Sequence, residues 1–160
     1  MLEIEKTRKK FEDYDLPLLI KRTLSSNKLL YPSRIQEECL ERLLGKDRKH
    51  LIGESENGTG KTLGFVVPSL SLLDLTEDSI QLLILSPTRE LSLQIHSVIQ
   101  IFTHTPKLHN SLNQNLSPLR SLTVQGATSH VSDVSSLKNK EASIWVWNGR
   151  RMGVKTGGER

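Results

Sequence analysis

Hydrophobic positions in the first part of the chain recur at helical intervals. Leucine and isoleucine have this spacing over residues 15–24, and Pro17 is tolerated near the start of a helix. A second helix is predicted behind Ser33, which has an N-cap residue type, with Gln36 three residues later completing a capping-box pattern. This second helix should end at Gly45, so the chain is expected to begin with two helices.

Two apolar runs of strand length follow. The first, at residues 50–53, is predicted to be the first core strand. A helix containing residues 63–67 should come next and kink or restart at Pro68. The second run, residues 81–86, is continuously apolar, as in a parallel sheet that is covered on both faces. An amphipathic helix is predicted behind it, over residues 90–102.

The pattern weakens in the second half of the chain. Residues 109–118 are rich in Asn, Ser and Gln and predict a surface loop. Strands are expected at residues 121–125 and 142–147, with a short helix at 131–138. Residues 149–160 hold four of the ten glycines and are expected to form a disordered or aberrant tail. The alternation of strands and helices predicts an α/β fold with a parallel sheet and right-handed crossovers.

Composition indicates a globular chain without a membrane span. Of the 160 residues, 36% are hydrophobic, and no stretch approaches the roughly 18 consecutive apolar residues that a spanning helix needs. Residues 1–10 form a charged arm without the apolar core of a secretion signal. The single cysteine, Cys39, excludes an internal disulfide and fits a reducing compartment. We therefore expect an intracellular monomer, in the nucleus or the cytoplasm, with no membrane partner.

The net charge of +4 is concentrated near the C-terminal end. Residues 144–160 contain four basic residues and one acid, which leaves a net charge of only +1 for residues 1–143. Charge alone therefore does not predict binding to RNA. Acidic residues interleave with the basic ones in the arm of residues 1–10, which favours a solvated charged segment over a nucleic-acid-binding arm. The five histidines have no spacing typical of a metal site.

The candidate chemistry lies in a glycine-rich segment between the first predicted strand and the next helix. Gly58 and Gly60 allow positive φ, so the backbone can wrap closely around a polyphosphate. The N–H groups and dipole at the start of a helix favour an anion there. Lys61 would reach the β- and γ-phosphates, and the Thr62 hydroxyl would bind Mg²⁺. The predicted phosphate-binding residues are Ser55, Glu56, Asn57, Gly58, Thr59, Gly60, Lys61 and Thr62. A glycine-rich turn that happens to precede a lysine is the alternative, and the strand and helix context argues against it.

Three motifs in order resemble those of the N-terminal RecA-like domain of DEAD-box RNA helicases. Phe11-Glu12-Asp13 and Pro32-Ser33-Arg34-Ile35-Gln36 have the spacing of the family's Q motif, whose glutamine hydrogen-bonds the adenine edges that distinguish ATP from GTP. Residues 55–62 are similar to motif I, in which Ala or Ser commonly replaces the first glycine. Residues 86–94 look like motif Ia, which contacts RNA phosphates in the family.

The resemblance extends from Phe11 to roughly Val98 and implies an ATP-dependent RNA helicase that uses ATP and Mg²⁺ and binds RNA. Lys61 and Thr62 are then the catalytic candidates, and Thr62 is the Mg²⁺ ligand. Outside the phosphate loop, the implied nucleotide-binding residues are Phe11, Leu29, Arg34 and Gln36. The implied RNA-binding residues are Pro87, Thr88, Arg89, Glu90 and Gly126.

Several positions depart from the family pattern. Leu29 stands where an aromatic residue usually packs on adenine, and Lys28 stands where the family has glycine. Trp147-Asn148-Gly149-Arg150 replaces motif Ib, Thr-Pro-Gly-Arg. Motif II, Asp-Glu-Ala-Asp, is absent from this sequence, as is the second RecA-like domain. We therefore expect a partial, truncated RecA-like domain over residues 11–148.

Three functions fit the sequence. The first is an ATP-dependent RNA helicase represented by a fragment, and the second is a catalytically inactive ATP/ADP-binding module or pseudohelicase fragment. The third is a phosphate-loop protein of another kind, such as a nucleotide kinase or a DNA-handling ATPase, and the spacing from Phe11 to Gln36 argues against it. Without motif II, ATP hydrolysis is expected to be near background. RNA binding is expected to be weak and salt-sensitive, because motif Ia and the basic tail offer only a few contacts to phosphates.

Overall fold

The chain is divided into two compact units. The computed structural model describes residues 8–47, 50–74, 76–77, 79–103, 121–124 and 144–148. The first unit comprises Met1–Asp74 and His104–Asn115, and the second comprises Leu75–Thr103 and Leu116–Arg160. All regular structure described in the first unit is helical, whereas the second unit contains every strand that the structure describes.

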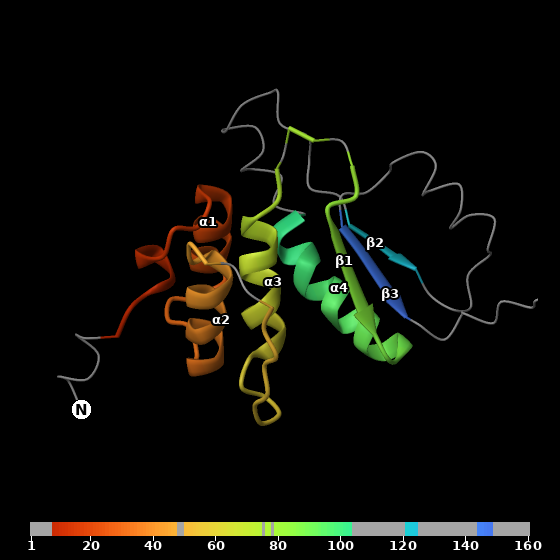
Figure 1. Cartoon of the computed structure of the whole chain (residues 1–160), viewed down its shortest axis with the longest axis horizontal. Helices are drawn as coiled ribbons and strands as arrows, with labels where there is room; N and C mark the ends of the chain where they lie inside the picture. Colours follow the sequence, from red (N-terminus) through yellow and green to blue (C-terminus); the bar gives the residue numbers. More distant parts are fainter. Residues whose placement is uncertain are drawn as a thin grey trace, which may run out of the picture. The chain divides into compact units, whose positions relative to one another are not determined.

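The first unit is built from a short 3-10 helix and three α-helices. The 3-10 helix is Phe11–Asp13, and it precedes α1 (Leu18–Ser26), α2 (Arg34–Leu44) and α3 (Lys61–Ser71). Helices α2 and α3 pack side by side (Figure 1). They approach closely at Gly64, where a Cβ would lie 3.5 Å from Cys39 Sγ. Burial raises the pKa of the Cys39 thiol, with Glu38 adding a smaller effect in the same direction.

The helix boundaries follow local chemistry. The N–H of Ser33 donates to Gln36 Oε1 at 2.9 Å, which confirms the predicted capping arrangement, and α2 ends before Gly45 as expected. Helix α1 begins later than predicted because Pro17 is its N-cap. Helix α3 continues through Pro68, so the helix does not restart there, and the expected kink at this residue stays a prediction. Proline removes one helical hydrogen bond at that point, and the buried surroundings of Pro68 preserve the rest of the helix.

Residues 50–53 lie in no strand, so the predicted first core strand is wrong for this structure. The side chain of Ile52 is 98% exposed. A strand needs a neighbour to satisfy its backbone N–H and C=O groups. The strands that the structure describes pair with one another and leave this segment unpaired.

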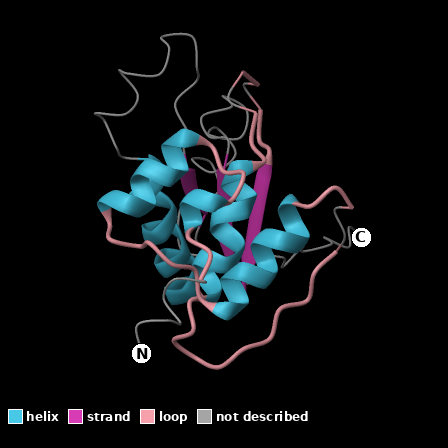
Figure 2. Cartoon of the chain, turned by 90° about the vertical axis from the view of Figure 1, so that its left-hand side faces the viewer, coloured by secondary structure: helices cyan, strands magenta, loops and turns pink. Residues whose placement is uncertain are grey.

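The second unit is a parallel three-stranded sheet with a helix packed on it. Its elements are β1 (Leu82–Ser86), α4 (Arg89–Thr103), β2 (Ser121–Val124) and β3 (Ile144–Asn148). The strands, drawn in magenta in Figure 2, have the order β1–β3–β2. Leu82 and Ser121 are both aligned to Ile144. Helix α4 contacts all three strands. These elements confirm the strands predicted at residues 81–86, 121–125 and 142–147 and the helix predicted at residues 90–102.

At β1, the described residues of the second unit cover only one face of the sheet. Ile144 and Val146 of the central strand are fully buried. Leu83 and Leu85 point to the opposite face, because side chains alternate along a strand, and they are 54% and 63% exposed. The expectation of a sheet covered on both faces is therefore wrong at this strand. The α/β class with a parallel sheet is confirmed.

Four expectations lie outside the described residues: the arm before residue 8, the loop at 109–118, the helix at 131–138 and the tail at 149–160. No helix in the described part of the chain is long and apolar enough to cross a membrane.

Lys28 provides a test of the end of α1. It has φ of 60°, in the left-handed region where a side chain is strained, while the N–H of Leu29 closes the helix on the Leu24 carbonyl at 2.9 Å. We predict that Lys28→Gly raises the free energy of unfolding by about 1 kcal/mol in denaturant titration, because glycine relieves this strain. The control, Asn27→Gly at φ of −90°, should not stabilise. A Lys28→Gly variant no more stable than the parent would contradict the assignment.

Candidate functional site

The loop that precedes α3 is a compact turn closed by its own hydroxyl groups. Gly58 and Gly60 have φ of 81° and 89°, as the sequence predicts for a loop that wraps around a ligand. The hydroxyl oxygens of Ser55 and Thr59 lie 2.7 Å apart. Thr59 Oγ1 also donates to the Glu56 carbonyl at 2.9 Å. The loop thereby holds a fixed shape at the N-terminus of α3.

The first turn of α2 holds this loop from the side. Ser33 Oγ donates to the carbonyl of Thr59 at 2.7 Å. Gln36 Nε2 donates to the next carbonyl, that of Gly60, at 3.0 Å. Gln36 is only 7% exposed, so these bonds form in a place where an unpaired carbonyl would be costly. Two successive carbonyls at the start of α3 are therefore fixed by the N-cap residue and by the first turn of α2.

Lys61, the first residue of α3, lies over the loop. Its Nζ donates to the carbonyls of Ser55 and Glu56 at 2.5 and 2.6 Å. An anion that enters the loop would meet this ammonium group together with the first N–H groups and the dipole of α3. Thr62 is the next residue of the helix and is half-buried. Its hydroxyl is an oxygen ligand of the kind that suits Mg²⁺.

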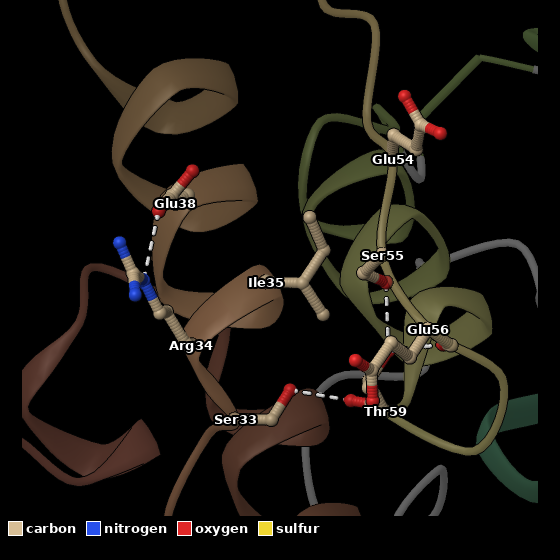
Figure 3. A pocket seen from close by; sticks show the side chains of 8 residues that line it. All are labelled: Ser33, Arg34, Ile35, Glu38, Glu54, Ser55, Glu56 and Thr59. Carbon is tan, nitrogen blue, oxygen red and sulfur yellow. Dashed lines mark hydrogen bonds and ion pairs between the residues drawn. The ribbon is translucent and has the colours of Figure 1, made fainter.

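A cavity of about 600 Å³ lies between the first turn of α2 and the loop (Figure 3). This volume is within the usual range for small-molecule sites. Ile35 faces it as an apolar wall, and Arg34 pairs with Glu38 at 3.5 Å at its side (Figure 3). The lining residues are Ser33, Arg34, Ile35, Glu38, Glu54, Ser55, Glu56 and Thr59. Three of them are carboxylates, which disfavours phosphate and suits an uncharged part of a ligand.

The structure brings only some of the predicted nucleotide-binding residues together. Arg34 lines the large cavity together with Ser55, Glu56 and Thr59 of the loop, and Gln36 contacts the loop at Gly60. Phe11 and Leu29 instead line a second cavity of about 40 Å³, and Phe11 is 3% exposed. That volume is close to the space of a single water molecule. In the described contacts, Gln36 uses one N–H and one lone pair of its side-chain amide, which can form one more bond of each kind.

Sequence reasoning missed two features of this site. Ser33 is predicted as a helix cap, but its hydroxyl bonds to Thr59, 26 residues away in the sequence. The carboxylates of Glu38 and Glu54 also line the cavity without having been predicted. The capping-box pattern predicts that Ser33 and Gln36 interact with each other. Their bonds to the carbonyls of Thr59 and Gly60 are visible only in the folded structure.

The residues predicted to contact RNA lie at the surface of the second unit, between β1 and α4. Pro87, Thr88, Arg89 and Glu90 are all exposed. Thr88 Oγ1 accepts a hydrogen bond from the N–H of Leu91 at 3.2 Å and so caps the start of α4. The turn offers the N-terminus of a helix and one guanidinium group to an anion. Gly126, the fifth predicted residue, lies outside the described residues.

Comparison with known proteins identifies related chains. A sequence model of the DEAD/DEAH box helicase family matches residues 33–146. The ATP-dependent RNA helicase dbp5 of Aspergillus niger is 48% identical over 97 residues, which cover 58% of this chain and 20% of that protein. The same-named helicase of Meyerozyma guilliermondii is 34% identical over 123 residues, covering 77% of this chain and 25% of that protein. This chain therefore spans about a fifth to a quarter of the length of these relatives.

Solved structures of DEAD-box proteins share this fold. S. cerevisiae Dbp5 bound to RNA and ADP BeF3 matches with a TM-score of 0.68 and 26% identity, covering 88% of this chain and 32% of that one. A DEAD box protein from Methanococcus jannaschii matches with a TM-score of 0.69 at 23% identity, over 87% of this chain and 34% of that one. The two matches confirm the predicted RecA-like α/β architecture.

The two positive-φ glycines of the loop allow a matched test of the contact with α2. A Cβ on Gly60 would lie 2.2 Å from Gln36 Nε2, whereas a Cβ on Gly58 would meet nothing within 4 Å. Both Gly→Ala substitutions strain the backbone, but only Gly60→Ala also displaces Gln36. We predict that Gly60→Ala lowers the free energy of unfolding by about 1 kcal/mol more than Gly58→Ala does.

Denaturant titration of both variants measures this difference. In a Gln36→Ala background the excess cost of Gly60→Ala should disappear, because the clashing amide is gone. Equal costs for the two substitutions in the parent chain would show that Gln36 does not constrain the loop.

Proposed function

Because the chain belongs to the DEAD/DEAH box helicase family, we propose that it is part of an ATP-dependent RNA helicase whose first unit binds an adenine nucleotide. The observation that carries this proposal is the pair of hydrogen bonds from Ser33 and Gln36 to successive carbonyls of the loop that also binds the ammonium group of Lys61. These bonds connect the residues that resemble the Q motif to those that resemble motif I.

The nucleotide is proposed to lie with its phosphates on the loop and its uncharged part towards α2. Lys61 would exchange its bonds to the loop carbonyls for bonds to phosphate oxygens, which are charge-assisted and therefore stronger. The cavity with three carboxylates suits the base or the ribose better than the phosphates. The remaining N–H and lone pair of Gln36 match the donor and acceptor on the edge of adenine.

Magnesium and RNA complete the proposal. Thr62 would hold Mg²⁺ by its hydroxyl when the nucleotide is bound, which neutralises part of the phosphate charge. The exposed turn at residues 87–90 would contact RNA phosphates, which fixes position without reading bases. The S. cerevisiae relative was solved with RNA and ADP BeF3. We also propose that the chain acts inside the cell as a monomer.

A nucleotide-binding module without turnover is the second candidate. The sequence of this chain contains no Asp-Glu-Ala-Asp motif to hold Mg²⁺ from the side opposite Thr62. Phosphoryl transfer needs the metal and the attacking water in place together. Binding without hydrolysis is therefore the activity proposed for the chain alone, and unwinding is proposed only for the longer proteins that it resembles.

Nucleotide discrimination tests the role of Gln36. We predict that ADP binds more tightly than GDP, because guanine would leave both free groups of Gln36 unpaired at a cost of about 1–3 kcal/mol each. Calorimetric titration with the two nucleotides measures the difference. Lys61→Ala should weaken ADP binding by about tenfold, whereas the exposed Lys46→Ala should leave it unchanged. Equal affinities for ADP and GDP would rule out the assignment of Gln36.

Turnover is tested separately. We predict that phosphate release from ATP by the purified chain stays at the level of the Lys61→Ala variant, with or without single-stranded RNA. RNA-stimulated hydrolysis that is lost on Lys61→Ala would show that this chain supplies a complete catalytic site and would reject the binding-only candidate.

A further inference from the structure

The N-terminal segment is tied to the residues that lead into α2. The N–H of Phe11 donates to the carbonyl of Leu30 at 3.0 Å, and Phe11 itself is buried. Three residues earlier, the Arg8 guanidinium donates to the carbonyl of Pro32 at 2.5 Å. The same guanidinium lies 5.8 Å from the ring centroid of Tyr31. Although Arg8 is exposed, it therefore has two defined partners immediately before α2.

The Pro32 carbonyl belongs to the same planar peptide group as the N–H of Ser33. Arg8 donates to the oxygen of this group, and the N–H at its other edge donates to Gln36 Oε1 at 2.9 Å. A cation on the oxygen polarises the peptide group and makes its N–H a stronger donor. The bond to Arg8 therefore fixes the plane of the peptide and strengthens its hold on Gln36.

We infer that Arg8 is a positioning residue for the nucleotide site and acts through the Pro32–Ser33 peptide on Gln36. From Gln36 the chain of hydrogen bonds continues to the Gly60 carbonyl at 3.0 Å, where the phosphate loop joins α3. Arg8 thus reaches the loop through three consecutive bonds without touching the nucleotide. The inference rests on the proposed nucleotide site, and it assigns a specific role to one residue of the arm that charge patterning alone predicts to be solvated.

Lys10 is a matched control for Arg8. Its Nζ lies 5.8 Å from the same Tyr31 ring, the same distance as the Arg8 guanidinium. Among the described contacts, only Arg8 also bonds to the Pro32 carbonyl. Loss of the cation over Tyr31 is therefore common to Arg8→Ala and Lys10→Ala, whereas loss of the bond to the peptide occurs in Arg8→Ala alone.

The first experiment is calorimetric titration of ADP into the full chain and its variants. Arg8→Ala should weaken ADP binding by about three- to tenfold, and Lys10→Ala by less than about twofold. In a Gln36→Ala background, Arg8→Ala should cause no further loss, because its route to the site is already cut. Arg8→Lys, which keeps a charged donor, should recover part of the affinity. Independent, additive losses from Arg8→Ala and Gln36→Ala would overturn the inference.

The second experiment needs no nucleotide and separates this inference from the proposed function. In ¹⁵N-correlated NMR spectra, Arg8→Ala should shift the backbone N–H of Ser33 and the side-chain amide of Gln36, and Lys10→Ala should leave both in place. If these shifts occur but ADP does not bind the parent chain, the coupling stands and the proposed function fails. Unchanged Gln36 resonances in a folded Arg8→Ala variant would overturn the coupling. If Arg8→Ala does not fold, Arg8→Gln, which replaces the charged donor by a neutral one, is measured in its place.

Discussion

The candidate site depends on two hydrogen bonds from the first turn of α2 to the carbonyls of Thr59 and Gly60. Without these two bonds, only the backbone and the packing of α3 against α2 would hold the loop next to α2. The N–H groups at the start of α2 also need hydrogen-bond partners. The side-chain oxygen of Gln36 accepts from one of them, and its side-chain nitrogen donates to the Gly60 carbonyl. Capping of one helix and positioning of the next are therefore a single interaction.

This arrangement explains why the residue at position 60 is so constrained. Gly60 has left-handed φ, accepts a bond from Gln36 and leaves no space for a Cβ beside the amide. Gly58 shares the left-handed φ but faces open space. The two glycines of the loop thus serve different purposes. Gly58 allows the backbone to turn, and Gly60 allows both the turn and the close approach of Gln36 from α2.

Local features of the fold could be predicted from the sequence, and features that depend on distant partners could not. The capping box at Ser33, the end of α2 and the helix after β1 all follow from residues a few positions apart. Residues 50–53 have the composition of a strand, but a strand forms only where a neighbour pairs with it. The contact between Ser33 and Thr59 spans 26 residues, so no local pattern could reveal it. Leu29 and Phe11 were assigned by resemblance, and packing places them around a different, smaller cavity.

The first unit contains every contact on which the proposed nucleotide site rests. The chain of hydrogen bonds begins at Arg8, passes through the peptide before α2 and ends at the start of α3. None of these bonds involves the sheet of the second unit, whose strands come from distant parts of the sequence. Helices with local capping form at a lower entropic cost than parallel strands that need distant partners. Nucleotide binding by the first unit can therefore be tested in this chain, whether or not another segment covers the exposed face of β1.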